Sequence, residues 1–109
     1  MLVITSSLLF GMRAKAQNVT IEGTIMDSIS KRTLTSATVS IAKATDSSLL
    51  NFTRADEDGF FRFKNIAPGK YLLSVSYVGY APLWLGIKAG STPTLALGNI
   101  YMTDASRLS

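Results

Sequence analysis

The 109-residue sequence contains no cysteine and no histidine. Without cysteine, the chain has no disulfide framework, no thiolate zinc site and no cysteine nucleophile. Without histidine, it lacks the usual general base, the commonest transition-metal ligand and any Ser-His or Cys-His pair. Ser28, Ser30 and Ser36 therefore have no histidine to activate them. These two absences exclude most familiar catalytic arrangements.

Long hydrophobic runs are also absent. The apolar stretch from Leu2 to Met12 has eleven residues, which is too few to cross a bilayer as a helix. It is followed by Ala14, Lys15 and Ala16, which place small residues at the two positions that a signal peptidase inspects. We predict a signal peptide over residues 1–16, with its basic n-region truncated and with cleavage after Ala16. The alternative is a buried first strand or helix.

The charge is modest and dispersed. The formal charge of +4 includes Arg13 and Lys15, which signal cleavage would remove. The remaining chain has nine Lys and Arg residues against seven Asp and Glu, and only Lys31 and Arg32 are adjacent. Nucleic-acid binding needs a clustered basic footprint, so this class of function is excluded. Export without cysteine fits a bacterial envelope protein, because small extracellular animal domains usually depend on disulfides.

No segment carries a helical stripe of three turns. From Asn18 onward, apolar residues recur at every second position, which indicates half-buried strands. The alternating segments are 19–25, 37–42, 49–55, 60–64, 71–78, 80–89 and 94–103. Seven short strands with turns about every ten residues predict an all-β fold, a seven-stranded antiparallel β-sandwich. We expect the core to contain Phe61, Phe63, Tyr71, Leu73, Val75 and Trp84, with Val39 and Ile41 facing them.

Glycine and proline mark the turns. Pro68 and Gly69 suit a tight bend, because proline fixes φ and glycine accepts a positive φ. Gly79 ends the strand that begins at residue 71. Pro82 cannot donate to a ladder, so we expect it on an edge or at a bulge. The apolar phase of the last strand shifts by one residue at Gly98, which predicts a β-bulge there.

The acidic stretch Asp56, Glu57 and Asp58 before Gly59 allows two interpretations. Asp56 and Asp58 are weak candidates for a calcium site, but calcium takes six or more oxygen ligands and the next acid is Asp104. We favour a turn in which aspartate binds its own backbone and Gly59 adopts a left-handed conformation, at the corner of a β-hairpin. On this interpretation, the chain has no metal site and no catalytic pair of carboxylates.

The order of several turn and core residues resembles the carboxypeptidase regulatory-like domain, a transthyretin-like Greek-key β-sandwich. The resemblance covers about residues 19 to 103. It is carried by Gly23, Asp27, Leu34, Ala37, Thr38, Val39, Thr53, Asp56, Asp58, Gly59, Phe61, Phe63, Pro68, Gly69, Tyr71, Leu73, Val75, Gly79 and Tyr80. In that family these positions form turns and core and carry no catalysis, so the resemblance implies a module that is not an enzyme and binds no cofactor.

The resemblance also implies a context. In Gram-negative bacteria, such domains often follow the signal peptide of TonB-dependent, SusC-like outer-membrane receptors. We therefore expect residues 17–104 to form the domain and residues 105–109 to begin a linker to a plug and β-barrel. The implied location is the periplasmic face of the outer membrane, in a protein of nutrient uptake. The implied partners are that plug and barrel, and periplasmic or SusD-like lipoproteins, with no nucleic acid and no small-molecule substrate.

A second reading stays open, a stand-alone secreted module that binds carbohydrate or a surface protein. It requires an exposed aromatic platform, for which Tyr80, Trp84 and Tyr101 are the candidates. On the receptor reading, we expect an exposed edge strand to be the main contact device, because its unpaired N–H and C=O groups accept another strand.

Overall fold

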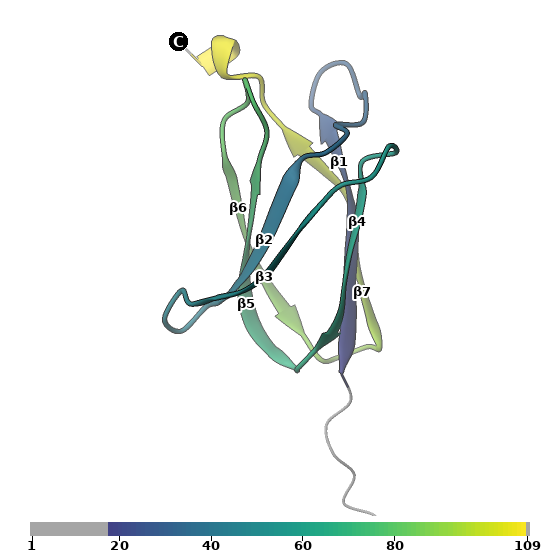
Figure 1. The fold of residues 1–109 in the computed structure, drawn as a ribbon, viewed down its shortest axis with the longest axis vertical. Helices are drawn as coiled ribbons and strands as arrows, with labels where there is room; N and C mark the ends of the chain where they lie inside the picture. The colour runs from purple at the N-terminus through teal and green to yellow at the C-terminus, as the bar shows by residue number, and fades with distance from the viewer. Residues whose placement is uncertain (1–17, 109) are drawn as a thin grey trace, which may run out of the picture.

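The computed structural model describes residues 18–108 (Figure 1), so the predicted signal peptide and its cleavage after Ala16 lie outside the described residues. Seven strands and one short 3-10 helix follow one another along the chain. They are β1 (Val19–Asp27), β2 (Thr38–Lys43), β3 (Leu49–Arg54), β4 (Phe60–Ile66), β5 (Gly69–Ser76), β6 (Leu83–Ala89), β7 (Thr94–Met102) and η1 (Ala105–Leu108).

The strands form two sheets, which confirms the predicted β-sandwich (Figure 1). One sheet has three strands in the order β4-β1-β7, and the other has four in the order β3-β2-β5-β6. All but one of the strand pairs are antiparallel. The exception is β1 with β7, which run parallel along the middle and edge of the three-stranded sheet. The first and last strands of the domain therefore lie side by side.

Alternation along each strand builds the core between the sheets. Phe61 and Phe63 of β4 are buried and pack edge to face, with their ring centroids 5.9 Å apart. On the neighbouring strand, Gly23 lies beneath Phe61, because a Cβ at that position would be 2.9 Å from the phenyl ring. The other predicted core residues Val39, Ile41, Tyr71, Leu73 and Val75 are buried as well.

The prediction that Trp84 belongs to the core is wrong. The inward residues of β6 are Leu83, Leu85 and Ile87, which pack against the core, so Trp84 alternates to the outer face. Its side chain is 60% exposed. The apolar residues on both faces of this strand conceal the phase of the alternation, and the largest side chain is on the side facing solvent.

The predicted bulge at Gly98 is confirmed. In the β1–β7 pairing, Glu22 lies opposite Ala96 and Thr24 lies opposite Asn99, so β7 contains one extra residue between these pairs. Gly98 has a φ of +72°, which is the left-handed conformation expected at such a position. Pro82 lies directly before β6, which is an edge strand of the four-stranded sheet.

The acidic turn is not the corner of a hairpin, which corrects that part of the prediction. β3 belongs to the four-stranded sheet and β4 to the three-stranded sheet, so residues 55–59 connect the two layers. The turn at Pro68 and Gly69 likewise leads from β4 in one sheet to β5 in the other. Both turns were placed correctly along the chain, but the pairing of the two strands that flank the acidic turn was not.

Candidate functional site

The corner at residues 55–59 is held by its own backbone. One carboxylate oxygen of Asp56, Oδ1, accepts hydrogen bonds from the backbone N–H groups of Asp58 at 2.8 Å and Phe60 at 3.0 Å. Gly59 has a φ of +76°, and its carbonyl accepts a hydrogen bond from the N–H of Ile25 at 2.7 Å. This arrangement agrees with the predicted backbone turn, in which the side chain of Asp56 organises the loop.

Near the same end of β1, two residues beyond Ile25, a buried carboxylate joins segments that are distant in sequence. Asp27 is the buried polar residue of the core, and its Oδ1 accepts hydrogen bonds from the N–H groups of Ile29 and Ser30, each at 2.8 Å. Its Oδ2 accepts a hydrogen bond of 2.5 Å from the hydroxyl of Tyr80, which is 53 residues away. The contact ties the loop after β1 to the turn between β5 and β6.

The same turn also holds the C-terminal end of the domain. Gly79 accepts a hydrogen bond from the N–H of Ala105 at 2.9 Å, and Ala81 donates one to the carbonyl of Thr103 at 2.9 Å. The ring of Tyr80 packs edge to face on Tyr77, at 5.4 Å between centroids. The hydrogen bond to the Asp27 carboxylate, followed by burial, raises the pKa of the Tyr80 phenol above its usual 10.0. Asp27 and Tyr80 both belong to the resemblance, but the sequence did not indicate that they meet.

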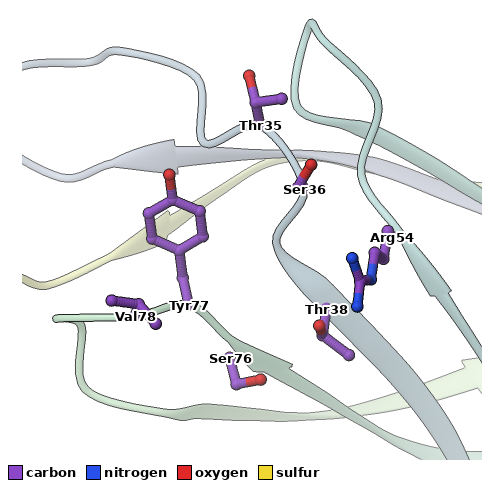
Figure 2. Close-up of a pocket in the computed structure, with 7 residues that line it drawn as sticks. All are labelled: Thr35, Ser36, Thr38, Arg54, Ser76, Tyr77 and Val78. Carbon is purple, nitrogen blue, oxygen red and sulfur yellow. The ribbon is translucent and has the colours of Figure 1, made fainter.

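A hollow of about 580 Å³ lies on the outer side of the four-stranded sheet (Figure 2). Its base is a row across the strands in which Thr38 of β2 lies between Arg54 of β3 and Ser76 of β5. Figure 2 shows the guanidinium of Arg54 extending toward Thr38. The rim comes from the loop before β2 and the turn after β5, through Thr35, Ser36, Tyr77 and Val78. The hollow therefore presents one cation among hydroxyl groups.

In the next row across the same sheet, the two outermost residues, which are on the edge strands, are large and apolar. Phe52, Ser40, Ser74 and Trp84 are successive neighbours across β3, β2, β5 and β6. Phe52 and Trp84 are 61% and 60% exposed, and Leu49 beside them is 62% exposed. Between these large side chains, the small residues Ser40, Ala42 and Ser74 form the base of a second hollow of about 330 Å³. We call this outer side of β3, β2, β5 and β6 the outer face.

The three candidate aromatic residues do not form one platform. Trp84 lies on the outer face, whereas Tyr101 lies on β7 of the other sheet, with the Nζ of Lys31 4.5 Å from its ring centroid. Tyr80 is half-buried and directs its hydroxyl at Asp27. Sequence reasoning missed Phe52 and Leu49 as surface residues. The reason is that Leu49, Leu50 and Phe52 do not alternate regularly with polar residues, so the pattern does not show which face of this strand points inward.

Within residues 18–108, no group of three or more His, Cys, Asp or Glu side chains is arranged to hold a metal ion. In the same part of the chain, no helix has the length and apolar character needed to cross a membrane. The carboxylate of Asp46 lies in the loop between β2 and β3, where a hydrogen bond from the backbone of Ser48 lowers its pKa. This carboxylate also organises a loop.

Two packed sheets, with polar clusters that serve turns and with large exposed apolar residues on the outer face, define an all-β sandwich module. The family profile of the carboxypeptidase regulatory-like domain matches residues 20–103. The chain belongs to the carboxypeptidase regulatory-like domain family. This confirms the resemblance inferred from the order of the turn and core residues. Among curated proteins, no relative matches the chain.

Several solved structures share the fold at low sequence identity. The group B streptococcus pilus 2b backbone protein aligns with a TM-score of 0.69 and 15% identity, over 87% of this chain and 44% of the pilus protein. The major pilin subunit of Bacillus cereus aligns with a TM-score of 0.65 and 18% identity, over 81% of this chain and 30% of the pilin. A hydroxyquinol 1,2-dioxygenase from Pseudomonas putida aligns with a TM-score of 0.62 and 11% identity, over 84% and 58% of the two chains.

The chain thus spans less than two thirds of each of these proteins. The fold occurs in structural subunits and in an enzyme alike, so the fold alone does not determine function.

Proposed function

We propose that the domain is a non-enzymatic accessory module of a TonB-dependent outer-membrane receptor, located on the periplasmic side and acting in nutrient uptake through protein-protein contacts. The observation that carries the proposal is the outer face of the four-stranded sheet. Leu49, Phe52 and Trp84 are exposed there over a base of small side chains. Large exposed apolar residues that share one face of a sheet are typical of an interaction surface. The partners we propose are the plug and barrel of the same protein.

The charge of this sheet supports the assignment to contacts. Its four strands carry Lys43, Arg54, Lys70 and Lys88 and contain no Asp or Glu. None of these four cations forms an ion pair within residues 18–108. Large apolar side chains on the edge strands, together with cations that have no ion-pair partner, suit a protein partner of complementary sign. The carboxylates of Asp27 and Asp56, in contrast, accept backbone hydrogen bonds and organise turns, which is a structural role.

The experiment starts from the genomic reading frame beyond Ser109. We expect it to continue into a plug and a barrel, and deletion of residues 18–104 from that protein should leave the barrel in the outer membrane while nutrient uptake falls. The double substitution of Phe52 and Trp84 by alanine should reproduce the uptake defect. A matched control is Lys64→Ala, an exposed residue of the other sheet. A stop codon at this position, with no plug or barrel gene nearby, would remove the receptor proposal.

A stand-alone carbohydrate-binding module is the second candidate, and the exposure of Trp84 favours it, because an exposed indole ring can stack on the apolar face of a sugar. Trp84 is the only tryptophan of the chain, so its fluorescence reports directly on such binding. On the receptor proposal, addition of neutral oligosaccharides leaves the emission unchanged. A saturable change with one sugar class, lost in Ser40→Ala or Ser74→Ala, would favour the carbohydrate module instead.

A further inference from the structure

The four edge strands of the sandwich differ in how they are protected. β3 has an irregular pairing with β2, because Ile41 pairs with Asn51 but Ala42 pairs with Leu49. β4 has an irregular pairing with β1 beside Asn65, which has a φ of +60°. β7 carries the bulge at Gly98. Bulges interrupt a ladder and hinder the addition of another strand, so these three edges have the usual protection.

β6 is the regular edge. It pairs with β5 in seven consecutive pairs, from Gly69 opposite Ala89 to Val75 opposite Leu83, without a shift of register. Pro82 precedes the strand and so removes no donor from it, and Lys88 is its one charged residue. On an antiparallel edge strand, every second residue directs its N–H and C=O groups away from the sheet. β6 therefore presents an ordered row of unpaired backbone groups.

The core is incompletely covered on the same side of the sandwich. Among the aliphatic residues between the sheets, those that pack on the core and remain half-buried are Leu83, Leu85 and Ile87 of β6 and Leu95 and Leu97 of β7. The opposite open side, between β3 and β4, is different, because its hollow is lined partly by Lys43, Asn51, Lys64 and Asn65. Polar side chains close one side of the sandwich, and aliphatic side chains remain at the other.

We propose that β6 accepts an eighth strand from a partner polypeptide, with aliphatic side chains at alternate positions of that strand. These side chains would cover Leu83, Leu85 and Ile87 from the open side, while the backbone of the strand satisfies the free N–H and C=O groups of β6. A folded surface would cover the leucines but would leave those backbone groups unpaired, at a cost for each. The proposal deepens the proposed function, because it names the edge through which the module makes its protein contact.

Charge specifies the partner further. Lys88 lies directly opposite Lys70 on β5, and like charges at paired positions of a sheet repel. The strands of this sheet contain no acidic residue that could offset the repulsion between these two lysines. A strand added to β6 places a side chain on the other flank of Lys88, where a carboxylate would be favoured. The partner strand therefore combines alternate aliphatic residues with an acidic residue near Lys88.

The probe is a capped eight-residue peptide of alternating valine and threonine, with one threonine replaced by glutamate. A peptide of the same composition with its valines consecutive is the matched control, because it keeps charge and hydrophobicity but loses the alternation. Trp84 lies on β6, so its emission measures binding. We expect the alternating peptide to bind and to protect alternate β6 amides from hydrogen exchange. Protection confined to β3, or equal binding of the two peptides, would overturn the proposal.

Two lysine substitutions on adjacent residues distinguish strand addition at β6 from a general effect of charge on peptide binding. Leu85→Lys puts a charge on the inward side of β6, as natural edge strands do to prevent pairing. Gly86→Lys adds the same charge on the outward side, where a Cβ would meet no atom within 4 Å. We expect Leu85→Lys to weaken peptide binding about tenfold or more and Gly86→Lys to change it by less than about twofold. Equal effects of the two would contradict strand addition.

Circular dichroism establishes whether Leu85→Lys is folded. If it is not, the exchange pattern of the unsubstituted protein decides the question alone, as described for the peptide. Concentration-dependent dimerisation through β6 without peptide would overturn the partner strand in favour of a second copy of this chain. Peptide binding needs no receptor, so it can succeed when the reading frame contains no barrel, or fail when the frame does contain one. The two proposals therefore fail separately.

Discussion

Gly59 offers a quantitative test of how the corner between the sheets is built. The substitution Gly59→Ala adds a Cβ that would lie 2.7 Å from the carbonyl oxygen of Ile25 and 3.0 Å from the Cβ of Thr33. The backbone cannot move aside easily, because Gly59 accepts a hydrogen bond from the N–H of Ile25, and the carbonyl of Ile25 accepts one from Leu34. The added methyl group therefore meets fixed backbone rather than a flexible side chain.

Two effects contribute to the expected loss of stability. A residue other than glycine at the φ of +76° costs about 1–3 kcal/mol. Forcing an added carbon into a packed site costs roughly another 1–3 kcal/mol. The sum is about 2–6 kcal/mol, and each kcal/mol lowers the Tm of a domain of this size by roughly 4–8 °C.

Gly79→Ala is the matched control. Gly79 has a similar φ of +86°, but a Cβ at this position would meet no atom within 4 Å, so only the conformational cost applies. Thermal unfolding followed by circular dichroism should place Gly59→Ala at least about 1 kcal/mol below Gly79→Ala in free energy of unfolding. Equal destabilisation of the two variants would refute the close approach of the corner to β1.

Three further expectations follow. Tyr80→Phe removes the hydroxyl group that donates a hydrogen bond to Asp27. Because the pKa of Tyr80 is raised in the folded state, the stabilisation by Tyr80 is present below pH 10 and is lost as the pH rises through the higher folded pKa. Between about pH 9 and pH 12, the free energy of unfolding should therefore fall less steeply with pH in Tyr80→Phe than in the unsubstituted protein. Millimolar calcium should leave the Tm unchanged, because the Oδ1 of Asp56 already accepts two backbone hydrogen bonds. An increase in Tm of several degrees would instead support a calcium site at this turn. Phe61→Ala should cost about 3–5 kcal/mol in chemical denaturation, whereas Trp84→Ala on the outer face should stay within about 0.5 kcal/mol, and comparable losses would place Trp84 in the core after all.

The alternation of apolar residues was sufficient to predict the fold class and most of the core. Val39, Ile41, Leu73 and Val75 lie in strands whose opposite faces carry serine, threonine or alanine at most positions, so the inward phase is unambiguous. The strand containing Trp84 has apolar residues on both faces, and there the largest side chain was assigned inward by size alone. Period-two alternation locates a strand but requires contrast between its faces to orient it.

Contacts between distant segments were beyond the sequence pattern. Asp27 and Tyr80 meet only because the parallel pair of β1 and β7 brings the first and last strands together beside the β5–β6 turn. The acidic corner was recognised as a turn from Asp56 and Gly59. Which sheet each of its two flanking strands belongs to depends on how the sheets pack on each other. Local turn chemistry does not encode that choice.

The most direct test of the contact function is photocrosslinking in cells that carry the natural reading frame. A photoreactive amino acid replaces Gly86 on the outward side of β6, and the same amino acid at Lys64 on β4 is the control. We predict covalent adducts to a polypeptide from position 86 and few from position 64. Absence of any polypeptide adduct at 86, or equal adducts at both positions, would contradict a module that works by binding a partner along β6.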